Sequence, residues 1–274
     1  MKDFKDKNVY IVGGSSGIGF STAKLLFRKG SHIILFARNT ERLQKAVNEI
    51  EGLRIFDDQK LSWMAMDVAN REEVKSIFKN SINDFGSPDL LINCAGRAIP
   101  YRFEDITYEQ LNETMKINLY GTWNTVEQAV PFMKEKGGHI VNVSSIAGFI
   151  GVYGLTDYCA SKFAVIGFSE ALRSELKPFG ISISVLCPPD TDTPGFEVEN
   201  RTKPEETKAI SSSAKLLQPD RVAKTLIKGI QKGKFLIIPG FNGKLSYYVK
   251  RLFPSLVTAI MDWDIRRVQL KGSR

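Results

Sequence analysis

Two residues four positions apart, Tyr158 and Lys162, have the side chains best suited to proton transfer in this 274-residue sequence. Residues four apart on a helix share one face, so the two side chains would lie together. A free phenol has a pKa of about 10 and is a slow acid or base at neutral pH. A nearby ammonium stabilises the phenolate and lowers that pKa. The pair therefore predicts a tyrosine that donates or accepts a proton.

Ser145 and Asn118 extend this candidate site. Ser145 ends an apolar run thirteen residues before Tyr158, and its hydroxyl could hold a substrate oxygen; the neighbouring Ser144 is the alternative. Asn118 could hold a water that connects Lys162 to solvent. A Tyr-x-x-x-Lys spacing also occurs by chance on surface helices. The order of the motifs along the chain is what favours the chemical interpretation.

The elements that position these residues alternate between apolar runs and helical patterns. Strict alternation predicts βαβ crossovers and therefore an α/β fold in a single domain, with a doubly wound parallel sheet of about seven strands. Ligands of such sheets bind at the carboxyl ends of the strands. The predicted strands are 8–12, 32–37, 61–66, 90–93, 139–144, 181–186 and 235–238, and the predicted helices are 17–29, 40–51, 71–85, 108–134, 157–177 and 219–232.

A glycine-rich turn follows the first predicted strand and leads into a helix. Glycines there allow a tight turn and bring a pyrophosphate close to the N–H groups of the helix N-terminus. The spacing is Gly-x-x-x-Gly-x-Gly, and a glycine-rich turn alone is a weak signal. Its position between strand and helix predicts a dinucleotide site. The residues assigned to it are Gly13, Ser15, Ser16, Gly17, Ile18 and Gly19.

The end of the second predicted strand indicates which dinucleotide binds. An NAD site normally has an acid there for the ribose 2′-OH, whereas this chain has Arg38, with Arg42 one turn further on. Guanidinium groups form charge-assisted bonds to a 2′-phosphate. The alternative is two exposed arginines on a basic protein. The missing acid favours NADPH.

Two further strand ends carry residues suited to a cofactor. Asp67 and Val68 follow the third strand, where a carboxylate could bind an adenine amino group. The fourth strand ends in Asn93-Cys94-Ala95-Gly96, and Asn93, Ala95 and Gly96 are assigned to the cofactor because small residues let the backbone approach it. Each position alone is weak evidence. With the glycine turn and Arg38, however, residues suited to a cofactor follow each of the first four predicted strands.

Composition and the absence of certain motifs argue against several other classes of protein. The chain is 43% hydrophobic and 25% charged, which is ordinary for a globular protein. No signal peptide or membrane-spanning run is evident, the three cysteines show no CxxC spacing, and two histidines argue against a metal site. We therefore expect a cytoplasmic protein. The net charge of +8 comes without a nucleic-acid-binding motif, so no nucleic-acid partner is expected.

The ordered motifs resemble those of the short-chain dehydrogenase/reductase family over roughly residues 5 to 240. The resemblance implies a Rossmann fold, a catalytic tetrad of Asn118, Ser145, Tyr158 and Lys162, and cofactor contacts from Tyr158 and Lys162. It also implies a homodimer or homotetramer formed through the long helices 108–134 and 157–177. One departure is Val12, where the family usually has threonine. That threonine supports the glycine turn rather than the chemistry.

Residues 188–217 form a proline-containing insertion after a strand, which predicts a lid over the ligand. The Pro-Pro-Asp-Thr-Asp-Thr run at 188–193 is similar to the lid of 3-ketodihydrosphingosine reductases. By that resemblance Pro188, Thr191 and Thr193 would contact the cofactor, and NADPH would reduce a lipid-like ketone, 3-ketosphinganine, to dihydrosphingosine. The alternatives are reduction of another bulky lipid or steroid-like ketone, and a non-catalytic NADPH-binding sensor or scaffold.

The last segment, 241–274, is predicted to be an amphipathic helical tail following a catalytic domain of residues 1–240. From Lys244 onward it has seven basic residues against two acidic ones. Its apolar stretch contains Pro254 and is too short to span a bilayer. Two interpretations remain open: peripheral membrane contact through 244–268, at the cytoplasmic face, and packing on the lid or a neighbouring subunit.

Overall fold

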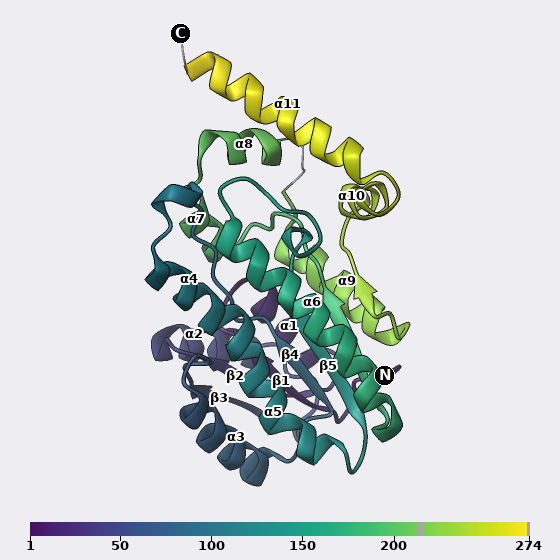
Figure 1. Ribbon diagram of the computed structural model, residues 1–274. Coiled ribbons are helices and arrows are strands. Elements are labelled where there is room, and N and C mark those ends of the chain that lie inside the picture. The colour runs from purple at the N-terminus through teal and green to yellow at the C-terminus, as the bar shows by residue number, and fades with distance from the viewer. Residues whose placement is uncertain (213–215, 273–274) are drawn as a thin grey trace.

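The computed structural model describes residues 1–212 and 216–272, and at its centre is a seven-stranded parallel sheet (Figure 1). The strand order is β3-β2-β1-β4-β5-β6-β7, so the order reverses between β1 and β4. The strands are β1 (Asn8–Val12), β2 (His32–Ala37), β3 (Leu61–Ala65), β4 (Leu90–Asn93), β5 (Gly138–Val143), β6 (Ile181–Leu186) and β7 (Leu236–Ile237). The predicted class and strand positions are confirmed, with ends that differ by one residue at most.

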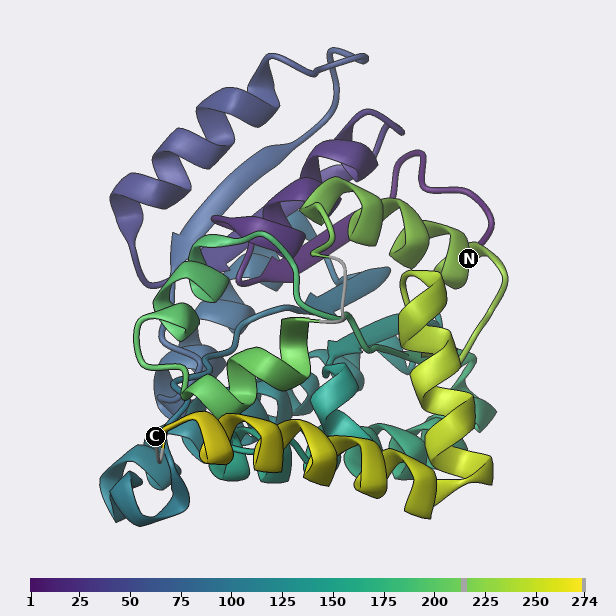
Figure 2. The ribbon, with the colours of Figure 1, turned by 90° about the horizontal axis from the view of Figure 1, so that it is seen from above.

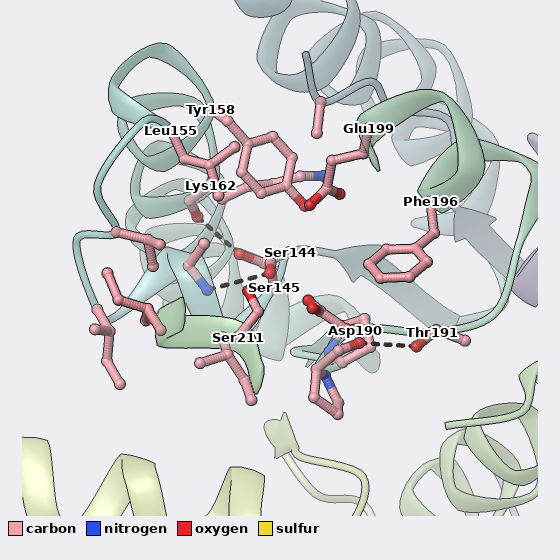
Figure 3. A pocket seen from close by; sticks show the side chains of 18 of the residues that line it. Ser144, Ser145, Leu155, Tyr158, Lys162, Asp190, Thr191, Phe196, Glu199 and Ser211 are labelled. Carbon is pink, nitrogen blue, oxygen red and sulfur yellow. Dashed lines mark hydrogen bonds between the residues drawn. The ribbon is translucent and has the colours of Figure 1, made fainter. Parts of the chain in front are cut away.

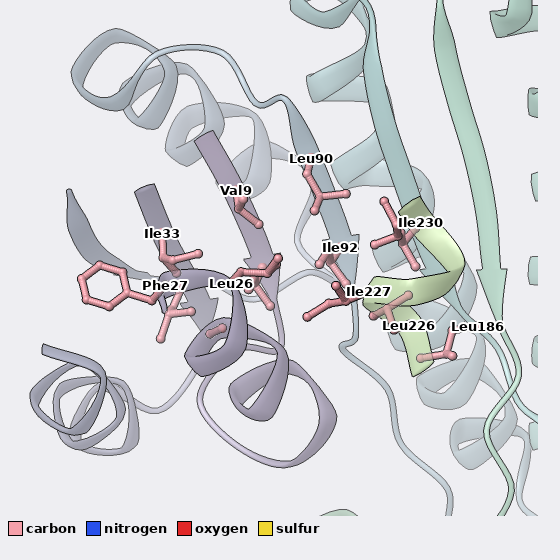
Figure 4. Packing of buried hydrophobic residues seen from close by; sticks show 14 of the residues in the cluster. Val9, Leu26, Phe27, Ile33, Leu90, Ile92, Leu186, Leu226, Ile227 and Ile230 are labelled. Carbon is pink, nitrogen blue, oxygen red and sulfur yellow. The ribbon is translucent and has the colours of Figure 1, made fainter. Parts of the chain in front are cut away.

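One face of the sheet is covered by α1 (Gly17–Phe27), α2 (Thr40–Glu51) and α9 (Pro219–Gln231). Leu26 and Phe27 of α1 and Leu226 of α9 pack against the strands, and all three side chains are completely buried (Figure 4). Eight of the eleven β1 and β2 residues are buried, because helices cover both faces of a parallel sheet. This packing fixes the start of α1 at the carboxyl end of β1.

The other face is covered by α3 (Arg71–Phe85), α5 (Gly121–Met133) and α6 (Thr156–Leu176). The predicted helix 108–134 is helical without a gap to Met133, but it is not a uniform α-helix. It consists of α4 (Tyr108–Met115), the π-helix η2 (Lys116–Tyr120) and α5. Short 3₁₀ turns complete the domain: η1 (Phe103–Asp105), η3 (Ile146–Gly148) and η4 (Lys177–Phe179).

The lid and the tail lie together beyond the carboxyl ends of the strands. The lid holds α7 (Pro194–Asn200) and α8 (Glu205–Ser212), where the sequence indicated only irregular chain. The tail forms α10 (Phe241–Leu252) and α11 (Pro254–Gly272), and α11 runs along α8 in both views (Figures 1 and 2). Of the two interpretations of the tail, packing on the lid is what the structure shows.

Candidate active site

A cavity of about 670 Å³ lies between the sheet, the lid and the tail. Its floor contains Ser145, Tyr158 and Lys162, so three of the four predicted catalytic residues meet in one space (Figure 3). Its volume falls within the roughly 300–1,000 Å³ of small-molecule sites. Apolar side chains from the floor, the lid and the tail form much of its wall, among them Ile146, Ile150, Leu155, Val198, Val257 and Ile260.

Tyr158 and Lys162 are positioned by the first two turns of α6. The Lys162 Nζ lies 5.6 Å from the centre of the Tyr158 ring and donates a hydrogen bond of 3.0 Å to the Val143 carbonyl. Burial lowers the pKa of Lys162 to about 8. Burial, with a smaller effect from the charge of Glu199, raises the pKa of the Tyr158 phenol, and a hydrogen bond with Ser145 opposes the rise. Tyr158 is therefore a neutral acid next to a cationic lysine at neutral pH.

The two serines at the end of β5 have different environments. The Ser144 hydroxyl is buried and donates a 2.8 Å hydrogen bond to the Lys162 carbonyl, so it anchors α6 to the sheet. The Ser145 hydroxyl accepts a 3.1 Å bond from the N–H of Ala147 and interacts with Tyr158. Only the Ser145 hydroxyl can therefore share a substrate oxygen with Tyr158. This geometry supports the choice made from the spacing.

Asn118 lies in the middle of the π-helix η2 and is completely buried. Its Oδ1 accepts a 2.8 Å bond from the N–H of Arg97, and its Nδ2 donates to the Arg97 carbonyl at 3.0 Å and to the Ser161 hydroxyl at 2.9 Å. A single π turn is frequent at functional sites because it displaces one residue from the helical repeat. Asn118 thereby joins the loop after β4 to α6. Both Nδ2 protons are engaged, whereas Oδ1 accepts one bond and keeps a lone pair with which it could still hold a water.

The glycine turn after β1 fits a dinucleotide phosphate. Gly13 has φ +78°, and a Cβ there would lie 2.6 Å from the Ala95 nitrogen, so no other residue is tolerated. The Ser16 N-cap of α1 makes no side-chain capping bond, and the first turn holds no acid. The N–H groups of that turn therefore keep their donors for an anion. Ser15, Ser16, Gly17, Ile18 and Gly19 would form this cradle.

The two arginines predicted to select NADPH are exposed beside the end of β2. Among the described residues, no ion pair involves Arg38 or Arg42, so both guanidinium groups are available to a phosphate. Asn39 caps α2 by accepting a 2.8 Å bond from the N–H of Arg42. Asp67 accepts a bond from the N–H of Ala69 through one carboxylate oxygen, which leaves the other oxygen for a ligand.

The residues predicted to bind the cofactor after β3 and β4 have two different environments. Some hold neighbouring elements together, and others lie at the glycine turn or the cavity. The Asn93 side chain is buried, donates to Asn142 at 2.9 Å and accepts from Thr125 at 2.8 Å, so it ties β4 to β5 and α5. Val68 packs tightly on Gly121. Ala95 and Gly96 lie differently: Ala95 contacts the glycine turn, and Gly96 lines the cavity next to Lys162. Of these four residues, Ala95 and Gly96 are the two whose backbone a cofactor could approach.

The predicted contacts from the lid also lie at the cavity. Pro188 is buried two residues after the end of β6, and Thr191 donates a 2.8 Å bond to the Pro189 carbonyl. Thr193 caps α7 by accepting a 3.1 Å bond from the N–H of Phe196, and its methyl group faces Gly17 of the glycine turn. The lid therefore begins against the cradle for the phosphates.

A charged group on the lid was not singled out from the sequence. Glu199 of α7 lines the cavity and forms a 2.7 Å ion pair with Lys203, whose ammonium also lies 3.8 Å from Asp190. The Lys203 side chain is only 3% exposed. The i,i+4 spacing of Glu199 and Lys203 was a usable signal. Nothing in the sequence indicates that Glu199 would line the cavity.

The fold, the tetrad residues and the glycine turn define a family, and a family model agrees with them. Residues 7–204 match the family model described as short chain dehydrogenase. The chain belongs to the short-chain dehydrogenase/reductase family and is an oxidoreductase of the class that binds a nicotinamide cofactor.

Individual proteins similar to this chain include two reductases of a sphingoid ketone. A 3-dehydrosphinganine reductase of Danio rerio is 41% identical over 238 residues, 86% of this chain and 72% of that protein. A 3-ketodihydrosphingosine reductase of Bos taurus is 39% identical over 258 residues, 93% of this chain and 77% of that protein. Among solved structures, the apo form of LigD from Sphingobium sp. strain SYK-6 has a TM-score of 0.75 and 30% identity, covering 95% of this chain and 98% of that one.

Proposed function

We propose that this chain reduces 3-ketosphinganine to dihydrosphingosine with NADPH, a step of sphingolipid synthesis. The observation that carries the proposal is the cavity itself, in which a Tyr–Lys pair lies at the floor of an apolar space closed by the lid and the tail. A long alkyl chain requires such walls, because apolar burial is the main source of its binding energy. The names of the relatives agree with this substrate.

The residues on the cavity floor divide the chemistry among them. NADPH, when bound, supplies the hydride. Tyr158 donates its proton to the ketone oxygen, and Ser145 donates a hydrogen bond to the same oxygen. The Lys162 ammonium stabilises the phenolate that remains. Asn118 holds the loop at Arg97 in place, and the apolar wall keeps bulk water from the reacting carbon.

The choice of NADPH over NADH is supported by charge at the end of β2. Arg38 and Arg42 are exposed there, and the position holds no carboxylate that would repel a 2′-phosphate. Hydrogen bonds to charged groups contribute about 1.5–3 kcal/mol each. We therefore expect a preference for NADPH of at least tenfold in kcat/KM.

A substrate panel tests the proposed reaction against its competitors. With NADPH, the purified protein should reduce 3-ketosphinganine with a higher kcat/KM than a steroid ketone or a short aliphatic ketone. Efficient reduction of the steroid ketone without reduction of 3-ketosphinganine would favour the alternative of another bulky ketone. NADPH binding without turnover of any ketone would favour the non-catalytic sensor.

The outer face of the tail supports peripheral contact with a membrane. Large apolar side chains stand at least half exposed along α10 and α11, among them Phe241, Leu252, Phe253, Trp263 and Leu270. Basic residues lie between them, and anionic headgroups attract such residues. Among the described residues, no helix is both long and apolar enough to cross a bilayer. Contact at the surface would let a lipid ketone enter beside the tail.

Assembly into a homodimer or homotetramer is supported by a second apolar surface. Tyr120 at the end of η2, Trp123 on α5 and Phe163 on α6 are 54%, 52% and 45% exposed. These segments belong to the helices on which the resemblance placed the subunit interface. Light scattering of the purified protein should give a dimer or a tetramer, and Trp123→Lys should shift it toward the monomer.

A further inference from the structure

The lid places negative charge directly beside the catalytic hydroxyl. Glu199 lines the same cavity as Tyr158, and its charge is the main electrostatic influence that raises the pKa of that phenol after burial. In Figure 3 the Glu199 carboxylate lies beside the hydroxyl end of the Tyr158 ring. A carboxylate here is unfavourable for a tyrosine that must stabilise a phenolate. We therefore expect the Glu199 carboxylate to make a favourable interaction that offsets its unfavourable effect on the Tyr158 phenolate.

The same carboxylate already holds an ammonium group. The Lys203 Nζ lies 2.7 Å from Glu199 and 3.8 Å from Asp190, and it also lies 4.6 Å from the centre of the Phe196 ring. Two carboxylates around one ammonium leave one negative charge uncompensated. Both carboxylates line the cavity, whereas Lys203 approaches them from the buried side of the lid. The uncompensated charge therefore faces the space that the substrate would occupy.

The proposed substrate carries an amine on the carbon next to its ketone. When the ketone oxygen accepts the proton of Tyr158, that amine is two bonds away from the reacting carbon, so it lies close to the Tyr158 hydroxyl. We propose that Glu199, assisted by Asp190, binds this amine as an ammonium and thereby selects 2-amino ketones. The inference rests on the proposed function and adds to it a residue that determines specificity.

Burial and charge are consistent with this subsite. Burial raises the pKa of Glu199, and the hydrogen bond from Lys203 opposes the rise. A second ammonium would favour the ionised carboxylate still further. It would also cancel the charge that raises the pKa of Tyr158, so the bound substrate would make Tyr158 a better proton donor. The amine would therefore contribute to both binding and turnover.

The test compares two ketones in the NADPH-loaded protein. One is 3-ketosphinganine, and the other is 1-hydroxyoctadecan-3-one, which has the same chain without the amine. For Glu199→Gln, kcat/KM toward 3-ketosphinganine should fall about 10- to 100-fold, the range for losing a hydrogen bond to a charged group. The amine-free ketone should be reduced at least as fast as by the wild type, since the charge beside Tyr158 is gone.

Glu197→Gln is the matched control, because Glu197 lies on the same helix with its side chain in solvent. It should leave both activities unchanged, and Asp190→Asn should give a smaller loss confined to the amine-bearing ketone. Equal losses on both ketones in Glu199→Gln would overturn the inference, because they would indicate a structural role in the lid. A wild type without preference for the amine would also overturn it. If the wild type reduced the amine-free ketone but not 3-ketosphinganine, the proposed function would be contradicted as well.

Discussion

The floor and the roof of the cavity are built in different ways. On the floor, Asn118 and Lys162 are at most 4% exposed, and their side chains are held by hydrogen bonds to neighbouring segments. On the roof, α10 and α11 are largely exposed. Helix α11 packs along α8, and α10 contacts Ile146, Phe149 and Ile238. The floor therefore holds the catalytic side chains at fixed distances from one another. The roof supplies apolar walls with fewer such restraints.

This difference separates the reaction from the choice of substrate. Proton transfer requires atoms placed within a few tenths of an ångström, which buried and hydrogen-bonded residues provide. Recognition of a long alkyl chain requires area rather than precision, which loosely packed helices provide. Substitutions on the floor should therefore affect every substrate. Substitutions on the roof should affect long-chain substrates selectively.

The largest effect is expected at Tyr158. Tyr158→Phe removes the proton donor but keeps the ring, so kcat should fall about 10²- to 10⁴-fold for every ketone. NADPH binding, followed by its fluorescence, should remain close to that of the wild type. A variant that retained activity toward any ketone would show that the floor does not carry the proton transfer.

The next effect concerns the cofactor. Arg38→Ala should raise the KM for NADPH roughly 10- to 100-fold, because a charge-assisted bond to the 2′-phosphate is lost. The KM for NADH should change little, and Arg28→Ala, an exposed arginine after α1, is the control. Equal weakening toward both cofactors would mean that Arg38 does not read the 2′-phosphate.

A third effect depends on pH. The pKa of Lys162 is lowered to about 8, so its ammonium is present at pH 7 and is lost as pH rises through 8. The Tyr158 phenol, with its raised pKa, stays protonated over that range. Reduction should therefore weaken above pH 8, approaching tenfold per pH unit. Lys162→Arg should remove this decline while lowering the maximal rate. A flat wild-type profile up to pH 10 would contradict the assigned role of Lys162.

Most of the floor follows from local sequence patterns. Buried parallel strands such as 33–37 are continuous apolar runs, and a Tyr–Lys pair at i,i+4 lies on one helix face wherever the helix packs. The π turn at Asn118 had no such signal, since it is a change of hydrogen-bond register inside a helical pattern. The start of α7 did have one, because Thr193 followed by Pro194 is typical of an N-cap and the first helical position.

The roof could not be predicted to the same degree. An amphipathic tail has the same pattern whether it packs on protein or on lipid, so the contact of α11 with α8 had no local signature. The ion pair of Glu199 with Lys203 was readable as a spacing, but its location depends on how the lid folds back. Both the contact of α11 with α8 and the location of the ion pair depend on the tertiary packing of the lid and tail.

The smallest effect is expected on the outer face of the tail. Trp263→Ser should weaken binding to anionic vesicles a few-fold, because a side chain at the interface is only partly buried and contributes less than the about 1.5–3 kcal/mol of a fully buried one. Reduction of a short, water-soluble ketone should not change. Phe56→Ser, which alters an exposed aromatic residue far from the tail, is the control. Unchanged vesicle binding after deletion of residues 244–274 would show that the membrane contact lies elsewhere.

The most direct test of the whole account is the stoichiometry of one reaction. Purified protein is incubated with NADPH and 3-ketosphinganine, NADPH is followed by absorbance, and the lipid product is identified by mass spectrometry. The account predicts one dihydrosphingosine formed for each NADPH consumed, and product formation slowed about 10²- to 10⁴-fold with Tyr158→Phe. Consumption of NADPH without dihydrosphingosine, or no consumption beside rapid reduction of an unrelated ketone, would contradict it.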